Sequence, residues 1–156
     1  MPATDTAVRC EVTVDASLER AFDVFVAAFD SWWPRSHTIA AAEMAEAVIE
    51  PRAGGRFYER GVDGSETVWG EVLTYDPPRA ITLSWHIGGD WQLEDAASEI
   101  QVSFTPNGAG TKVALAHDHL ERHTAAEALR AAVGGEGDGG WNDLLKRYSE
   151  AVSAAG

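Results

Sequence analysis

Cysteine is almost absent from this 156-residue chain, since Cys10 is the single one. An internal disulfide and a metal site built on cysteines are therefore both excluded. Cys10 lies in an expected strand, where a buried, unreactive thiol is favoured over a nucleophile.

Positive charge is also scarce. The chain has 12 Lys plus Arg against 25 Asp plus Glu, a formal net charge of −13. Such a surface argues against binding to nucleic acid, whose phosphates need cations, and against binding to anionic membranes.

Long apolar runs are missing as well. No window approaches the roughly 20 apolar residues that a membrane-spanning helix needs. Residues 1–7 lack the basic and apolar regions of a signal peptide. We therefore expect a cytoplasmic protein, with residues 1–7 as a flexible tail and residues 8–156 as one domain.

The chain is rich in apolar residues and in tryptophan. Hydrophobic residues make up 45% of it, and six residues are Trp, which favours a core or cavity with aromatic walls. Apolar residues recur at helical spacing near the C-terminus, at Trp141, Leu144, Leu145, Tyr148 and Val152. This spacing predicts a helix with one apolar stripe. A helix of this length is marginal in water, so the stripe needs a broad apolar surface to lie on.

Strands are predicted for most of the remaining chain, because apolar and polar residues alternate there. The expected strands are 8–14, 47–50, 56–60, 66–75, 81–87, 100–105 and 112–117. From residue 47 onward the strands follow one another through turns and one loop, which predicts an antiparallel meander.

The helical and irregular segments lie around these strands. A helix of about twelve residues is expected from Leu18, near the average length, and a capping box at Thr124 predicts a short helix to Val133. Residues 91–97 are expected to form a loop, and 134–140 a flexible glycine-rich link. The stretch 35–46 fits either a helix or a loop folded over an opening.

The predicted fold is α+β: a curved antiparallel sheet of six to seven strands wrapped around a long C-terminal helix. Such a sheet rarely closes tightly on one helix, so a cavity between the two is the natural place for a ligand.

Several short motifs carry a family resemblance over residues 8–152. They are 12–17 followed by Ala21-Phe22, 54–57, 70–72, 77–79, 83–85, 110–113, His117 and Gly140-Trp141. In this order they resemble the SRPBCC (START-like, helix-grip) superfamily, and within it the branch named for the activator of heat-shock protein 90 ATPase. The resemblance implies a helix-grip fold. It leaves the function open, because the superfamily includes lipid carriers, hormone receptors, aromatic polyketide cyclases and co-chaperone domains.

Alternation suggests which polar side chains face inward. By alternation along the strand, His117 lies on the same face as Val113 and Leu115, and Glu59 lies on the same face as Phe57. An inward Glu59 or His117 would serve as a ligand contact or an acid/base group. The alternatives are a solvated or salt-bridged Glu59 and a core histidine bonded to backbone.

Two further patterns give weaker predictions. Trp69 shares a predicted strand face with Glu71 and Leu73, and alternation does not decide which face is inward. His117, His119 and His123 have a spacing that could hold zinc, but no fourth ligand has motif spacing, so no metal is expected.

Three function classes follow. The preferred one is binding of a small hydrophobic or aromatic molecule, without a cofactor. The alternatives are a cyclase/dehydratase-like enzyme using Glu59 or His117, and a domain that binds a chaperone or other protein. The expected ligand-binding residues are Trp33, Phe57, Glu59, Trp69, Trp85, Phe104, His117, Trp141 and Leu145.

Overall fold

The computed structural model describes residues 7–35, 37–134 and 140–155. Its elements in chain order are β1 Val8–Val14, α1 Leu18–Val26, η1 Phe29–Ser31, β2 Met44–Ile49, β3 Arg56–Gly61, β4 Glu66–Asp76, β5 Ala80–Ile87, β6 Leu93–Asn107, β7 Gly110–Asp118, η2 Leu120–Arg122, α2 Ala126–Gly134 and α3 Trp141–Ala155. The expected flexible tail and glycine-rich link fall largely on residues outside these ranges.

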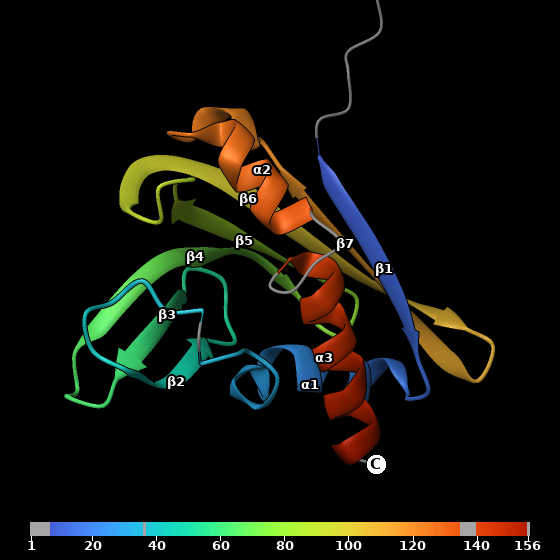
Figure 1. Cartoon of the computed structure of the whole chain (residues 1–156). Helices are drawn as coiled ribbons and strands as arrows, with labels where there is room; N and C mark the ends of the chain where they lie inside the picture. Colours follow the sequence, from blue (N-terminus) through green and yellow to red (C-terminus); the bar gives the residue numbers. More distant parts are fainter. Residues whose placement is uncertain (1–6, 36, 135–139, 156) are drawn as a thin grey trace, which may run out of the picture.

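The strands form one antiparallel sheet of seven strands in the order β1-β7-β6-β5-β4-β3-β2. Strands β2 to β7 therefore pair with their neighbours in sequence. β1 instead joins β7, from Val8 opposite His117 to Val14 opposite Thr111. Figure 1 shows the sheet curling around α3 and α1, which confirms the predicted α+β helix-grip fold.

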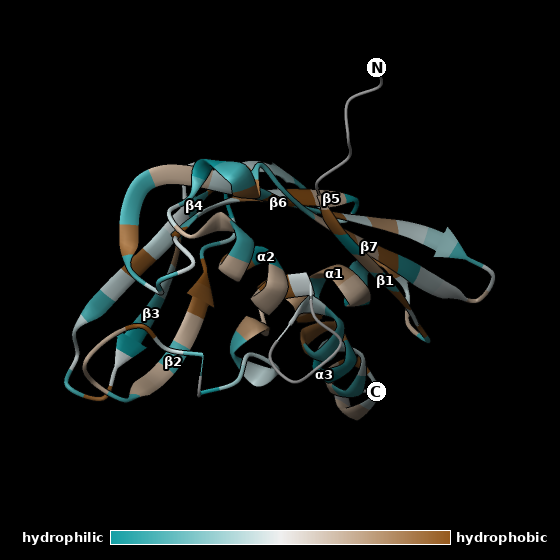
Figure 2. Ribbon diagram, turned by 45° about the horizontal axis from the view of Figure 1, so that its top comes forward, coloured by the Kyte–Doolittle hydropathy of each residue, from teal (hydrophilic) through white to brown (hydrophobic). Residues whose placement is uncertain are grey.

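Helix α3 buries its predicted stripe. Trp141, Leu144, Leu145, Tyr148 and Val152 are each 3% exposed or less. The stripe lies against β1 and α1. Figure 2 shows strands banded in brown and teal, the alternation of a sheet with one buried face.

Helix α1 lies between α3 and the sheet. The ring centroid of Phe25 is 5.3 Å from that of Tyr148 on α3 and 5.7 Å from that of Phe104 on β6. The Tyr148 hydroxyl donates to the Ala21 carbonyl over 2.6 Å. Ser17 caps the helix, its side chain accepting the Arg20 N–H. The helix ends at Val26, shorter than expected, and η1 follows as a separate turn.

The predicted loop at 91–97 was wrong, because β6 already begins at Leu93. Leu93 pairs with Ile87 and Ser98 pairs with Trp85 across a bulge in the ladder. Alanine and acidic residues have low strand propensity, so here the pairing with β5 determines the structure.

The shared face predicted for Trp69, Glu71 and Leu73 was also wrong. Trp69 is 1% exposed, whereas Leu73 is 43% exposed and Glu71 lies on the surface. The register shifts where Phe57 pairs with Gly70 and the next residue of β3 pairs with Val68, so Trp69 is the extra residue of a bulge. A bulge breaks the alternation and turns Trp69 inward.

For the stretch at 35–46, the described residues include no helix. Residues 37–43 run without regular structure, and the strand begins at Met44, earlier than its predicted start at residue 47. In the described part of the chain, no helix is both long and apolar enough to cross a membrane.

Candidate functional site

Aromatic rings meet between the sheet and its helices. We call five of them the aromatic cluster: Trp33, Phe57, Trp69, Trp85 and Trp141, each 5% exposed or less. Ring centroids are 5.6 Å apart for Trp33–Trp69, 6.1 Å for Trp33–Trp141, 5.1 Å for Phe57–Trp69 and 6.3 Å for both Phe57–Trp85 and Trp85–Trp141. These separations are typical of stacked and edge-to-face pairs. All five residues were predicted to line the ligand site, and the structure brings them together.

The indole N–H groups distinguish Trp33 from the other buried tryptophans. Trp32 donates to Val24 O over 3.1 Å, Trp69 to Glu59 Oε1 over 3.1 Å, Trp85 to Ile87 O over 2.8 Å and Trp141 to His117 Nδ1 over 3.0 Å. The Nε1 of Trp33 is the single buried side-chain nitrogen or oxygen without a hydrogen-bond partner among the described residues. Leaving such a donor unpaired costs about 1–3 kcal/mol.

Glu59 contacts the cluster through Trp69 and is fully buried. Its carboxylate accepts the Trp69 indole N–H, the Ile39 backbone N–H over 3.0 Å and the Thr38 hydroxyl. The side chain faces inward, as its alternation with Phe57 suggested. Its hydrogen bonds tie the segment before β2 to β4, so Glu59 is a structural acceptor in this arrangement.

His117 is fully buried between Trp141 and Ser98. Its Nδ1 accepts the Trp141 indole N–H, and its Nε2 lies 2.8 Å from Ser98 Oγ. Burial, together with the nearby His123, lowers the pKa of His117 to about 3. The imidazole is therefore neutral near pH 7 and a weak base, which argues against a role as general base.

A group of buried hydrogen bonds around Ser98 was not predicted from the sequence. His123 Nε2 lies 2.8 Å from Ser98 Oγ and accepts the Ser98 backbone N–H over 3.1 Å. His123 Nδ1 lies 2.5 Å from Glu94 Oε1, which also accepts the Thr124 N–H over 3.0 Å. Burial raises the pKa of Glu94, but the hydrogen bonds from His123 and Thr124 outweigh this and lower it.

These residues were missed because residues 91–97 were assigned to a loop and His123 was considered only as a metal ligand. Ser98 alternates with the apolar residues Ile100 and Val102, and this alternation could have predicted that Ser98 faces inward. The zinc hypothesis rested on His119 as well. His119 has a φ of 65° and lies near Asp118 and Glu121. No metal-binding group of three His, Cys, Asp or Glu exists in the described ranges.

The remaining predicted site residues lie deeper in the core. Phe104 packs edge-on against Phe22, with centroids 5.2 Å apart, and against Phe25. Leu145 is buried on the α3 stripe.

Cys10 is half-buried, and burial raises the pKa of its thiol to about 11, so the thiol stays protonated at neutral pH.

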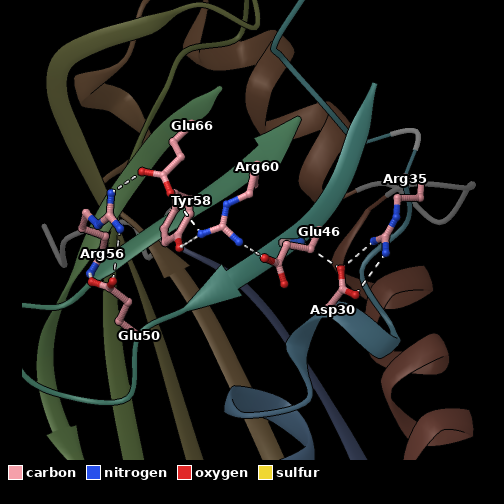
Figure 3. Close-up of polar contacts among 9 residues, drawn as sticks. Asp30, Arg35, Glu46, Glu50, Arg56, Tyr58, Arg60 and Glu66 are labelled. Carbon is pink, nitrogen blue, oxygen red and sulfur yellow. Dashed lines mark hydrogen bonds and ion pairs between the residues drawn. The ribbon is translucent and has the colours of Figure 1, made fainter. Parts of the chain in front are cut away.

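A ladder of ion pairs covers strands β2 to β4 (Figure 3). Arg56 and Arg60 both contact Glu66, over 2.8 and 3.0 Å, and Arg60 also pairs with Glu46. The Arg56 guanidinium lies 4.3 Å from the ring centroid of Tyr58. These carboxylates are neutralised by arginines, so they are poor candidates for acid/base chemistry.

Comparison with known proteins gives one family and several solved structures. The family model described as Activator of Hsp90 ATPase homolog 1-like protein matches residues 15–152. No curated protein matches the chain. The structure of an anthrahydroquino-gamma-pyrone synthase, Txn09, complexed with SUM, is 42% identical, with 97% of this chain and 99% of that chain covered and a TM-score of 0.65.

Two proteins from Micromonospora echinospora are also similar. CalC, described as a self-sacrificing resistance protein, is 29% identical over 97% of each chain, with a TM-score of 0.71. CalU16 is 18% identical over 96% of this chain and 77% of that chain, with a TM-score of 0.59, and shows a shared fold alone.

Proposed function

Because the chain belongs to the family of Activator of Hsp90 ATPase homolog 1-like proteins, we propose that it binds a small aromatic molecule between α3 and the sheet. The 42% identical relative is an anthrahydroquino-gamma-pyrone synthase. The proposed ligand class is therefore a flat, fused-ring aromatic that carries carbonyl or hydroxyl oxygens.

The observation that carries this proposal is the unpaired indole N–H of Trp33. A ligand oxygen that accepts this N–H would remove the cost of burying it unpaired. The neighbouring rings of Trp69 and Trp141 offer aromatic faces for a flat ligand. Binding sites of this kind are mostly apolar, with a few polar groups that set orientation.

The other predicted site residues have supporting roles in this proposal. Phe57 and Trp85 extend the aromatic wall. Glu59 and His117 hold the indoles of Trp69 and Trp141 by accepting their N–H groups. Leu145 and Phe104 support the wall from the core.

The test is the affinity for 1,8-dihydroxyanthraquinone, a probe of the proposed class, measured by quenching of tryptophan fluorescence. Trp33→Phe keeps an aromatic ring and removes the N–H, and should weaken binding about tenfold, which corresponds to one hydrogen bond. Trp91→Phe is the control, because Trp91 is 48% exposed. Equal affinity of the two variants would contradict the role of Trp33, and a wild-type protein that binds no such compound would contradict the ligand class.

A cyclase-like enzyme is the second candidate, because the 42% identical relative is named as a synthase. Binding is favoured over catalysis by Glu59 or His117, since each is occupied by hydrogen bonds to the protein. Incubation with a linear polyketide-type thioester, followed by mass spectrometry, separates the two. A cyclised product that appears with wild type and disappears with Trp33→Phe would favour the enzyme.

Protein binding has less support. Among the residues that the structure describes, the exposed large apolar ones are Val62, Val68, Leu73, Trp91 and Leu93. Val68 and Leu93 line a shallow groove of about 320 Å³ together with Gly70, Arg56, Glu71 and His86, among others. This groove is open and has charged residues in its lining, unlike a large apolar docking patch.

A further inference from the structure

We propose that Glu94, His123 and Ser98 act through His117 to hold the Trp141 indole in place within the aromatic cluster. These residues would then control ligand affinity without touching the ligand. The consequence for binding rests on the proposed function, whereas the positioning itself can be tested without a ligand.

The hydrogen bonds form one continuous chain from the start of β6 to the cluster. Glu94 contacts His123, His123 contacts Ser98, Ser98 contacts His117 and His117 contacts Trp141, over 2.5, 2.8, 2.8 and 3.0 Å. Ser98 and His117 are fully buried, and His123 is 5% exposed. In such surroundings a satisfied polar chain is strong and an interrupted one is costly.

Donor-only groups determine which nitrogen of each histidine accepts a hydrogen bond. The Trp141 indole can only donate, so His117 Nδ1 accepts and His117 Nε2 carries the proton. The Ser98 backbone N–H can only donate, so His123 Nε2 accepts and His123 Nδ1 carries the proton. The Ser98 hydroxyl then accepts from the His117 Nε2–H, and its own proton can go to His123 Nε2 at 2.8 Å or to the Trp85 carbonyl at 3.4 Å. Glu94 accepts the Nδ1–H of His123.

This polarity makes each member depend on the next. Glu94 keeps the proton of His123 on Nδ1, which leaves Nε2 free to accept from Ser98. The Ser98 hydroxyl gives the His117 Nε2–H an acceptor, and this orients His117 Nδ1 toward Trp141. Trp141 is the first residue of α3, so the same chain anchors this end of the helix to β7.

The indole held in this way is a wall of the proposed ligand site. The Trp141 ring lies 6.1 Å from Trp33 and 6.3 Å from Trp85, centroid to centroid. A shift of Trp141 would change the surface next to the unpaired Trp33 N–H. Ser98 and Glu94 are therefore positioning residues.

Ser98→Ala tests the link directly, because it removes the hydroxyl and keeps the backbone N–H that His123 accepts. The Trp141 indole N–H resonance, read by ¹⁵N NMR of the ligand-free protein, should shift or broaden. Affinity for 1,8-dihydroxyanthraquinone should fall about tenfold, the loss expected for one disturbed hydrogen bond. Ser84→Ala is the matched control, since Ser84 is a buried serine of β5 whose hydroxyl accepts the Glu71 N–H instead. Its Trp141 resonance and affinity should stay as in wild type.

Two variants of Glu94, one of them conservative, give a second test. Glu94→Ala should reproduce the shift at Trp141, and Glu94→Gln, which retains an acceptor oxygen, should restore the wild-type resonance. Unchanged Trp141 resonances in both Ser98→Ala and Glu94→Ala would overturn the proposal.

Wild-type protein decides the matter if the variants do not fold. Imidazole ¹⁵N shifts at pH 7 should show His117 protonated on Nε2 and His123 protonated on Nδ1. The opposite tautomer of His117 would overturn the proposal. If no aromatic compound binds to wild type while these NMR results hold, the proposed function fails and the positioning chain stands.

Discussion

Trp69 donates its indole N–H to the carboxylate of Glu59 over 3.1 Å, with both side chains almost completely buried. The same carboxylate accepts from Thr38 and Ile39, in the segment that precedes β2. Glu59 therefore joins a wall of the aromatic cluster to the irregular segment at 37–43. Asp30 makes a related connection, accepting from Arg35 and from the Ala47 N–H of β2 over 2.7 and 2.9 Å (Figure 3).

Glu59→Leu should destabilise the protein, because the donors from Ile39, Trp69 and Thr38 would lose their acceptor. We expect a loss of about 2–5 kcal/mol in the free energy of unfolding, measured with urea. Glu59→Gln should cost much less, since its oxygen accepts the two N–H groups and the Thr38 hydroxyl can accept from the amide. Equal losses in the two variants would show that the negative charge matters more than the acceptor.

Acid should destabilise the protein through His117 before most carboxylates titrate. The pKa of His117 is lowered to about 3, below its ordinary value of 6.5, so the unfolded chain binds the proton first as pH falls. Stability therefore decreases from about pH 6.5 downward, by about 1.4 kcal/mol per pH unit for this residue. His117→Asn, whose side-chain oxygen can still accept from Trp141, should show a shallower slope in urea unfolding between pH 6.5 and 4.5. An unchanged slope would rule out His117 as the source.

Tyr148→Phe should weaken the contact between α3 and α1. The hydroxyl that donates to the Ala21 carbonyl over 2.6 Å is fully buried, so its removal should cost about 1–2 kcal/mol of stability. Burial also raises the pKa of Tyr148 above its ordinary value. An alkaline absorbance titration should therefore show one late-ionising tyrosine in wild type that is missing from the variant; identical titration curves would contradict the buried position.

Trp141→Ala should be the most disruptive single change in α3. The side chain is 3% exposed and bonds to His117, so we expect a loss of about 3–5 kcal/mol, read from thermal and urea unfolding. Trp91→Ala is the control and should change stability by less than about 0.5 kcal/mol, because Trp91 is half-exposed. A Trp141→Ala protein that melts like wild type would contradict the packing of α3 against the sheet through Trp141.

The sequence was sufficient for the fold because its periodic patterns agree with one another. The stripe from Trp141 to Val152 and the alternation in the strands each specify a buried face, and the two faces meet. The aromatic cluster followed from the same reasoning for Phe57 and Trp85, whose parity is regular.

Irregular features were beyond this reasoning. Trp69 faces inward through a bulge, which depends on the pairing of β3 with β4. The first half of β6 has little strand propensity and is held by β5, so Ser98 was read as following a loop. The polar chain from Glu94 to Trp141 joins residues distant in sequence, and its hydrogen bonds depend on distances that no local pattern contains.

The strand order also has a consequence for the route by which the chain folds. Strands β2 to β7 pair with sequence neighbours, so this meander can form hairpin by hairpin. β1 must instead find β7 across more than half of the chain, from Val8 to His117. Contacts of such separation carry a larger loop-closure cost, and we expect β1 to dock late in folding. The segment between β1 and β2 holds α1 and Trp33, so we expect the aromatic cluster to be completed only when β1 has paired with β7.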